Sequence, residues 1–325
     1  MHEFQYTKAS DVGQAVASVS PSGAKFVAGG TTLIDLMKLE VERPKLLVDI
    51  NGLPLDGIEP EGGGLKIGAM VRNSDLAHHA EVQGLYPVLS QALLSGASPQ
   101  LRNMATTGGN LLQRNRCYYF RDVNYPCNKR NPGSGCSAMD GFHRIHAVLG
   151  TSAHCIATHP SDMAVAMMAL GATIFVTGPK GDRNIPIAKF YLLPGTTPDR
   201  ENVLAAGEII THVTLPAPAP NAKSHYLKRR DRASYEFALA SAAVIVELDG
   251  RKIRKAQVAM GGVGTIPWRS PEAEHELAGA EASERNFRRA AEAALRGAKG
   301  HKDNSFKIEL AKRTLVRALQ TVTQA

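Results

Sequence analysis

The chain has 325 residues, 43% hydrophobic and 21% charged, a composition typical of a folded protein with room for two or three domains. No apolar run reaches the roughly 18 residues of a membrane-spanning helix, and we expect no signal peptide because the N-terminal residues contain no apolar core. The net charge of +8 arises from residues 221–325, since residues 1–220 hold 18 basic and 18 acidic side chains. These basic residues are scattered and accompany no nucleic-acid-binding motif, so we expect a solvated or subunit-docking surface and no nucleic acid.

We expect residues 1–55 to form a small βαβ-like lobe. The segment KFVA (25–28) precedes a glycine pair, which predicts a strand followed by a tight turn. The segment TTLIDLMKLE (31–40) repeats apolar residues at helical spacing, and KLLVDI (45–50) is a short apolar run typical of a buried strand.

Residues 56–220 are expected to form a larger mixed lobe, which a long irregular loop at 114–155 interrupts. Ser161 is a suitable N-cap for the apolar helix that follows it. A proline-rich segment ends the lobe. The expected elements are strands at 65–70 and 209–215, helices at 86–96 and 159–172, and a hairpin at 173–190.

Residues 221–325 are expected to form a C-terminal α+β domain. The strands AVIVEL (243–248) and KIRKAQVAMGG (252–262) flank a DGR turn, which is the pattern of a β-hairpin. Two helices should follow, at about 282–299 and 304–322. The predicted fold class of the whole chain is therefore α+β, with two lobes followed by this domain.

Two glycine turns are the best candidates for a ligand site. AGGTTL (28–33) and ATTGGNLLQ (105–113) each combine a glycine pair with threonine hydroxyls, and glycine allows a backbone to approach a phosphate closely. A single such turn is usually an ordinary connection between a strand and a helix. Two of them could grip an extended dinucleotide from both sides, and Asp162 could bind its hydroxyl groups or simply cap a helix.

Four cysteines follow the spacing C-x9-C-x8-C-x18-C in and beside the irregular loop. An even count permits disulfides, but this chain is much larger than disulfide-stapled scaffolds. Structural zinc sites favour closely spaced cysteine pairs, and four thiolates can also bind an iron–sulfur cluster. The residues alone leave these interpretations open, as well as four unrelated thiols, for Cys117, Cys127, Cys136 and Cys155.

Several segments, in this order, resemble the FAD-binding medium subunit of the molybdenum hydroxylases, the superfamily of xanthine dehydrogenase and carbon monoxide dehydrogenase. They are FVAGGTTLIDLMK, ATTGGNLLQ, HPSDMAVAMMALGA, EIITHVTLP and YLKRRDRASYEFALAS. The segment RNRCYYFRDVNYPCNKRNPGSGC is most similar to the flavin and iron–sulfur subunit of the bacterial periplasmic aldehyde oxidoreductase subtype. The resemblance covers essentially the whole chain.

The resemblance assigns roles to individual residues. The first glycine turn would bind the FAD pyrophosphate, and the second would form the opposite cradle. Asp162 would hold the hydroxyl-bearing chain of the flavin, and Lys228 would approach the pyrimidine side of its ring, where a cation stabilises the charge of reduced flavin. The residues so implied are Phe26, Val27, Ala28, Gly29, Gly30, Thr31, Thr32 and Leu33; Thr106, Gly109 and Asn110; Asp162; Ile209 and Ile210, near the isoalloxazine; and Lys228.

For the cysteines, the resemblance implies a [4Fe–4S] cluster bound by all four thiolates. Nearby basic side chains would then balance the negative charge of the cluster. We expect the neighbouring histidines to be loop or packing residues, because four cysteines already fill the site. The basic residues are Arg114, Arg116, Arg121, Lys129 and Arg130, and the histidines are His143, His146, His154 and His159.

The function implied by the resemblance is electron transfer without a catalytic side chain on this chain. A large partner subunit with the molybdenum cofactor would oxidise an aldehyde to a carboxylic acid, and a small partner would carry [2Fe–2S] clusters that pass electrons to the FAD. The complex would be exported to the periplasm by a signal on a partner subunit. If no partner carried such a signal, we would expect the chain in the cytoplasm. The alternatives are a subunit of a purine or N-heterocycle hydroxylase or of an aryl-CoA reductase, and more distantly a scaffold protein with a zinc loop.

Overall fold

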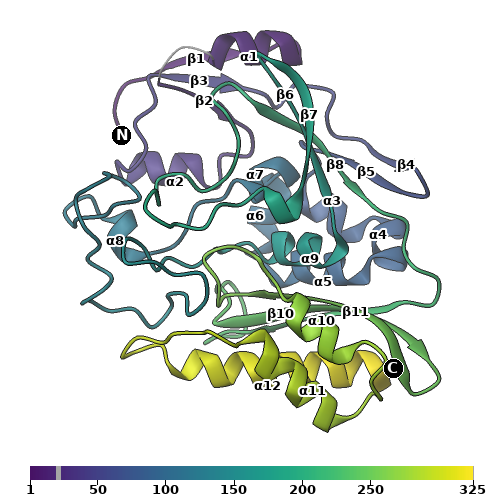
Figure 1. Cartoon of the computed structure of the whole chain (residues 1–325). Coiled ribbons are helices and arrows are strands. Elements are labelled where there is room, and N and C mark those ends of the chain that lie inside the picture. The colour runs from purple at the N-terminus through teal and green to yellow at the C-terminus, as the bar shows by residue number, and fades with distance from the viewer. Residues whose placement is uncertain (20–22, 325) are drawn as a thin grey trace.

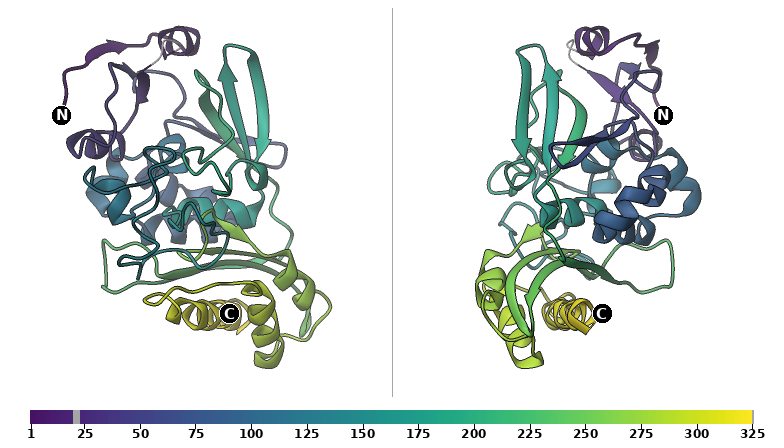
Figure 2. Two further views of the ribbon diagram at one scale, coloured as in Figure 1. Left: turned by 60° about the vertical axis from the view of Figure 1, so that its left-hand side comes forward. Right: turned by 90° about the vertical axis from the view of Figure 1, so that its right-hand side faces the viewer.

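The computed structural model describes residues 1–19 and 23–324, and its strands form three sheets. Figure 1 shows the N-terminal sheet at one end of the molecule and the C-terminal sheet with its helices at the other. Helices from the central part of the chain lie between them, and Figure 2 shows the same arrangement from two further sides. This is the α+β architecture that the sequence predicts. Among the described helices, none is both long enough and apolar enough to cross a membrane.

The N-terminal sheet is parallel and has the order β1-β3-β2. The expected strand, helix and strand are present, but the helix is shorter than predicted at both ends, because Thr31 and Thr32 precede it and Leu39 and Glu40 follow it in turns. The sequence analysis missed the preceding strand and helix, since QYTK (5–8) is polar and largely exposed. The elements are β1 (Gln5–Lys8), α1 (Val12–Val19), β2 (Ala24–Val27), α2 (Leu33–Lys38) and β3 (Leu46–Asp49).

The central sheet has the order β4-β5-β8-β6-β7, and every neighbouring pair is antiparallel. The predicted hairpin is present, although its second strand ends at Pro186 and a short 3-10 turn (Ile187–Lys189) follows. The strands are β4 (Ile58–Glu61), β5 (Gly64–Gly68), β6 (Thr173–Gly178), β7 (Gly181–Pro186) and β8 (Ile209–Leu215). The helices are α3 (Asn73–His78), α4 (Ala80–Leu85), α5 (Pro87–Ser95), α6 (Pro99–Met104), α7 (Thr107–Leu111), α8 (Tyr118–Arg121) and α9 (Asp162–Leu170).

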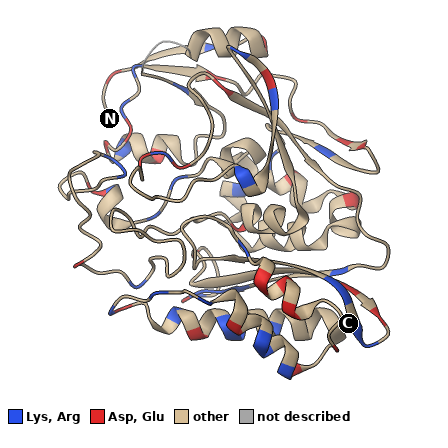
Figure 3. Ribbon diagram, in the orientation of Figure 1, with Lys and Arg blue, Asp and Glu red and all other residues tan. Residues whose placement is uncertain are grey.

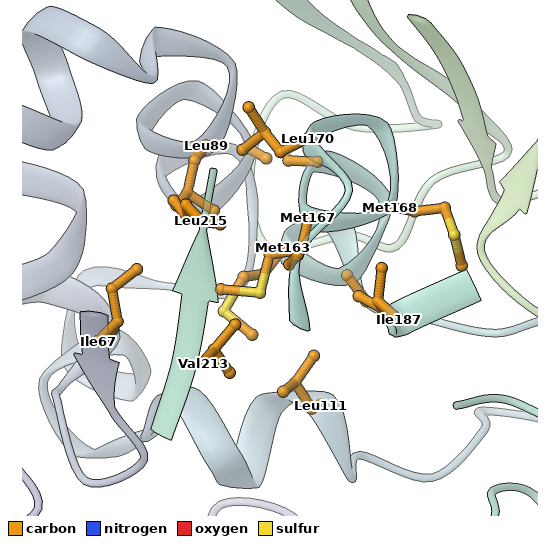
Figure 4. Close-up of a cluster of buried hydrophobic side chains, with 14 of the residues drawn as sticks. Ile67, Leu89, Leu111, Met163, Met167, Met168, Leu170, Ile187, Val213 and Leu215 are labelled. Atoms are coloured by element: carbon orange, nitrogen blue, oxygen red, sulfur yellow. The ribbon is translucent and has the colours of Figure 1, made fainter. Parts of the chain in front are cut away.

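Helix α9 lies at the centre of the molecule, and all nine of its residues are buried. Ser161 caps it as predicted, because its hydroxyl accepts a 2.9 Å hydrogen bond from the Ala164 N–H. Gly171 ends it with a left-handed φ of 74°. Figure 4 shows Met163 and Met167 of this helix packed among leucines, isoleucine and valine from the surrounding helices and the central sheet. This packing fixes the N-terminal end of α9, where Asp162 lies.

The C-terminal sheet has the order β12-β11-β10-β9. One face contacts α5 and α9, and the other contacts α10 and α12 (Figure 1). Figure 3 shows Lys and Arg spread along α11 and α12 with Asp and Glu among them, so the basic residues are scattered, as the sequence indicates. The elements are β9 (Lys223–Arg229), β10 (Ala240–Asp249), β11 (Lys252–Gly261), β12 (Trp268–Arg269), α10 (Pro271–Leu277), α11 (Glu284–Ala294) and α12 (Phe306–Gln324). The prediction missed α10 and placed the end of α11 at residue 299, five residues too late.

Candidate functional site

A cavity of about 1000 Å³ opens between the N-terminal lobe and the central helices, and both glycine turns line it. Ile209 and Ile210 of β8 and Asp162 of α9 form further parts of its wall. The structure therefore brings together segments that are up to 212 residues apart in the sequence, from Lys25 to Phe237. The predicted flavin residues that line this cavity are Phe26, Ala28, Gly29, Gly30, Thr31, Thr32, Leu33, Thr106, Gly109, Asn110, Asp162, Ile209 and Ile210.

Gly29 allows the two glycine turns to meet. A Cβ atom at this position would overlap the backbone carbonyl of Met104, which directly precedes the second turn. Gly30 adopts a left-handed φ of 72°, a conformation that favours glycine. Gly29 is thus required by the contact between two backbones, whereas Gly30 is required by its left-handed conformation.

The second turn is held in place by its own hydroxyls and amides. Thr106 caps the short helix α7, and its hydroxyl accepts a 3.2 Å hydrogen bond from the Gly109 N–H. Asn110 accepts hydrogen bonds from the Ser161 hydroxyl at 2.6 Å and from the Gln113 amide at 2.7 Å. Asn110 therefore ties the second turn to the N-terminus of α9.

Asp162 has two close polar partners on β9. Lys228 donates to one carboxylate oxygen at 2.8 Å, and the Tyr226 hydroxyl donates to the other at 2.5 Å. The Lys228 ammonium also donates to the Ser95 carbonyl at 3.0 Å, and its side chain is 3% exposed. Lys228 thus lies behind Asp162 and does not line the cavity, so its predicted role beside the flavin ring remains a prediction. Val27 also lies outside the cavity, where it packs on Met37 and Leu47.

Three of the arginines that were expected to balance a cluster, Arg114, Arg116 and Arg121, line the flavin cavity. Arg114 bridges Glu42 at 2.7 Å and Glu201 at 2.5 Å. Arg116 and Arg121 both pair with Asp35 of α2, at 3.2 and 2.6 Å. Sequence reasoning missed the acidic partners, because they lie about 70 to 90 residues from the arginines and belong to other elements.

The β9–β10 connection is a further part of the cavity wall that the sequence did not reveal. Tyr235 has a left-handed φ of 51°, and it lines the cavity together with Arg232 and Phe237. The Arg116 guanidinium lies 4.9 Å from the centre of the Phe237 ring, a cation–π contact that joins this connection to the irregular loop. RASYEF lies within a segment that resembles the family, but the sequence assigned no role to its residues.

The four cysteines are free thiols that surround one small cavity of about 10 Å³. Cys117, Cys127 and Cys155 are buried, and Cys136 is half-buried. Cys127 and Cys136 face each other across an isolated antiparallel bridge. Within the described residues, no group of three or more His, Cys, Asp or Glu side chains is arranged to hold a metal ion as it stands. The structure thus brings the four predicted ligands together around one cavity.

The surroundings of the sulfurs combine burial with hydrogen-bond donors. Burial raises the pKa of Cys117 to about 12 and that of Cys155 to about 11, although Lys129 opposes the shift at Cys155. The Ala157 N–H points at the Cys155 sulfur at 3.4 Å, and Nε2 of His146 lies 3.1 Å from the Cys117 sulfur. Such thiols need a bound cation to become thiolates near neutral pH. His146, expected to be a packing residue, directly contacts a predicted ligand.

The C-terminal domain anchors the irregular loop. Lys307 of α12 is fully buried, and its ammonium donates to the carbonyls of Ile145 at 3.2 Å, His146 at 2.8 Å and Gly262 at 2.5 Å. The Asn304 amide adds a 3.2 Å hydrogen bond to the His146 carbonyl. The loop is therefore held near its C-terminal end by side chains that come from about 160 residues further along the chain.

Comparisons with known proteins agree with this architecture. The family described as FAD binding domain in molybdopterin dehydrogenase matches residues 2–218, and the CO dehydrogenase flavoprotein C-terminal domain matches residues 224–322. The aldehyde oxidoreductase FAD-binding subunit PaoB of Escherichia coli (strain K12) is 53% identical over 323 residues, 98% of each chain. The carbon monoxide dehydrogenase medium chain of Hydrogenophaga pseudoflava is 28% identical over 90% of this chain and 86% of that relative.

The structural comparison points the same way. A solved structure of carbon monoxide dehydrogenase from Hydrogenophaga pseudoflava superposes with a TM-score of 0.78 and 27% identity, covering 99% of this chain and 97% of that chain. Quinoline 2-oxidoreductase from Pseudomonas putida 86 has the same fold, with a TM-score of 0.76 at 23% identity. These matches, together with the cavity between the glycine turns, show that the chain belongs to the FAD-binding medium subunits of the molybdenum hydroxylases.

Proposed function

We propose that this chain is the FAD-binding, electron-transferring subunit of a molybdenum-containing oxidoreductase that converts aldehydes to carboxylic acids. Membership of this family implies a bound flavin and partner subunits. The 53% identity to an aldehyde oxidoreductase subunit favours aldehydes as the substrate class. The observation that carries the proposal is the cavity of about 1000 Å³ between the glycine turns. Its volume and its two backbone cradles suit an extended dinucleotide.

The chain's own groups would bind and orient the FAD. Residues 28–32 and 106–110 would hold the pyrophosphate, since glycine leaves the backbone free to approach it, and Asp162 would accept hydrogen bonds from flavin hydroxyls. Ile209 and Ile210, each 3% exposed, would give the ring an apolar wall. The bound flavin supplies the redox chemistry, and this chain contributes no nucleophile or general acid to aldehyde oxidation.

We further propose that the four cysteines bind one [4Fe–4S] cluster. Four free thiols around one cavity, with a backbone N–H and an imidazole nitrogen directed at two of the sulfurs, form a donor set suited to such a cluster. The space of about 10 Å³ is close to that of a single water, so the loop must open outward around a cluster. Low-temperature EPR of the reduced complex tests this proposal, because a [4Fe–4S] cluster adds a signal distinct from that of [2Fe–2S] clusters, whereas zinc adds none.

The partners follow from the family. A medium subunit of a molybdenum hydroxylase assembles with a large and a small subunit. We propose that the small subunit carries [2Fe–2S] clusters that deliver electrons to the FAD, and that the molybdenum cofactor on the large subunit selects and oxidises the substrate. On this view the residues that choose between aldehydes and other substrates lie on the large subunit.

We also propose a periplasmic location, reached by export together with a partner that carries the signal. The proposal rests on the resemblance of the cysteine segment to the periplasmic aldehyde oxidoreductase subtype. Cell fractionation with and without the signal of the partner tests it. A chain that remains in the cytoplasm in both cases would contradict the proposal.

An anaerobic substrate panel tests the proposed activity. The purified complex is mixed with an aromatic aldehyde, an aliphatic aldehyde, a purine or a quinoline, and the visible absorbance of its flavin is followed. Bleaching by the aldehydes alone is the expected result. Bleaching by the purine or the quinoline alone would replace the aldehyde assignment with an N-heterocycle hydroxylase and would leave the flavin assignment intact.

A further inference from the structure

A second small cavity lies between the flavin cavity and the cysteine site. Its volume is about 30 Å³, which is enough for an ordered water, since one water needs roughly 10–15 Å³ of such space. Gln113, Pro160 and Glu201 line both this cavity and the flavin cavity, whereas Lys129 and Cys155 line both this cavity and the cysteine cavity. This linking cavity therefore borders both predicted redox sites.

Two buried donor atoms at the linking cavity have no hydrogen-bond partner among the described residues. One is Nδ2 of Asn115, a residue 3% exposed, and the other is Nε2 of His159. Burial lowers the pKa of His159 to about 4, and its Nδ1 accepts from the Ser161 N–H at 3.4 Å, so Nε2 carries the hydrogen. Buried donors of this kind are normally satisfied by ordered water. Asn115 also reaches the cysteine site, because its Oδ1 accepts a 2.9 Å hydrogen bond from the Cys117 N–H.

An ion-pair chain runs along the same path. Lys129 donates to Glu201 at 3.1 Å, Glu201 pairs with Arg114 at 2.5 Å, and Arg114 pairs with Glu42 at 2.7 Å. Burial alone would raise the pKa of Glu201, but Lys129 and Arg114 hold it below its usual range. Glu201 is therefore a fixed negative charge, placed between a cation beside Cys155 and the wall of the flavin cavity.

We propose that Glu201 is a positioning residue that couples the charge of the iron–sulfur site to that of the flavin, and that an ordered water in the linking cavity joins Glu201 to Asn115 and His159. The inference rests on the proposed [4Fe–4S] site. The water accepts hydrogen bonds from the two orphaned donors and directs its own hydrogens toward the carboxylate. A fixed negative charge opposes the addition of an electron to either neighbouring centre, so Glu201 lowers the reduction potentials of both.

Redox titration of the purified complex tests the inference in Glu201→Gln, with the flavin followed by visible absorbance and the cluster by low-temperature EPR. Glutamine keeps the size and an oxygen acceptor but removes the charge. We expect both centres to become easier to reduce, each by roughly tenfold in its equilibrium constant, or about 59 mV for the one-electron cluster and about 30 mV for the two-electron flavin. Lys129→Met should shift the cluster in the opposite direction.

Glu208→Gln is the matched control. Glu208 also lines the flavin cavity and pairs with an arginine, Arg183, at 2.7 Å, but it borders neither the linking cavity nor the cysteine cavity. Its substitution should leave the cluster potential unchanged.

If Glu201→Gln alone loses its cofactors, the double variant Lys129→Met/Glu201→Gln restores the charge balance. The flavin potential of this double variant should still exceed that of the parent.

The outcomes separate this inference from the proposal on which it depends. A parent complex with FAD but without the EPR signal of a reduced [4Fe–4S] cluster would overturn the [4Fe–4S] site and the coupling together. An iron-loaded parent in which Glu201→Gln moves only one potential, or neither, would overturn the coupling alone. A cluster shift of equal size in Glu208→Gln would show that any carboxylate in the chain has this effect, and it would remove the special role of Glu201.

Discussion

The flavin cavity and the cysteine loop achieve their order in different ways. The cavity is built from the ends of regular elements, and its two turns are locked by a backbone contact at Gly29 and by the Thr106 cap. The loop at 114–155 contains one four-residue helix, α8, and otherwise consists of turns and single bridges. The loop is held by charged side chains that donate hydrogen bonds to backbone carbonyls. Arg130 donates to the Tyr119 carbonyl at 2.9 Å, and Lys307 donates to the His146 carbonyl.

This difference indicates how each region depends on its cofactor. The flavin cavity is supported by the central apolar core around α9, so its walls should persist without FAD. The cysteine loop has a much smaller apolar cluster, in which Cys117, Cys127 and Cys155 are themselves members and against which Cys136 packs. Ordering such a segment costs conformational entropy that few apolar contacts offset, so we expect a metal centre to supply much of its stability.

The largest effect should come from Cys127→Ser. Serine is a poor ligand for iron, so the variant should lose most of its cluster iron and become sensitive to proteolysis within residues 114–155, while retaining part of its FAD. Iron analysis, flavin quantification and limited proteolysis measure the three effects. Ser137→Ala is the control beside Cys136, because it removes one exposed hydrogen bond, at 3.0 Å to Pro126, and no thiol. Unchanged iron in Cys127→Ser would remove Cys127 from the ligand set.

Gly29→Val should damage the flavin cavity while sparing the cysteine loop. Its Cβ would overlap the Met104 carbonyl and drive the two turns apart, at a cost on the order of several kcal/mol in unfolding free energy. FAD content and denaturant unfolding are the measurements. Gly84→Ala is the control, since a Cβ there meets open space within α4, and it should be neutral or slightly stabilising. Full flavin occupancy in Gly29→Val would contradict the contact between the turns.

Lys307→Met should loosen the loop from the C-terminal side. Burial lowers the pKa of Lys307 to about 7, and its removal leaves three buried carbonyls without this donor. We expect a loss of about 3 kcal/mol in unfolding free energy and faster hydrogen exchange at residues 145–148, with FAD retained. The exposed Lys299 provides the control Lys299→Met. Unaltered exchange in Lys307→Met would show that the loop needs no anchor on α12.

A smaller effect should appear as acid sensitivity. The pKa of His159 is about 4 in the folded chain against an ordinary 6.5, because burial disfavours its charged form. Between these values the unfolded chain binds a proton that the folded chain does not, so stability falls as pH drops from about 6.5 to about 4, by on the order of 2 kcal/mol. His159→Gln removes this titration and should flatten the pH dependence of unfolding, whereas the exposed His275→Gln serves as the control. An unchanged slope in His159→Gln would assign the acid sensitivity to other groups.

The parts of the site that could be predicted from sequence are those with strong local signals. The glycine turns, the Ser161 cap and the cysteine spacing are local patterns, and the structure places their residues where they can act together. The Lys228–Asp162 ion pair and the acidic partners of Arg114 could not be found this way, because each pairs residues more than 60 positions apart. Strand β1 was missed because its QYTK sequence is polar and its stability comes from pairing with β3.

The most direct test of the account is native mass spectrometry of the anaerobically purified chain, with the metal identified by elemental analysis of the same sample. The account predicts one species that carries both a FAD and a cluster of four irons and four sulfides. A chain that carries FAD together with zinc, or FAD without any metal, would contradict the account of the cysteine loop. A chain that carries iron but no flavin would contradict the assignment of the large cavity.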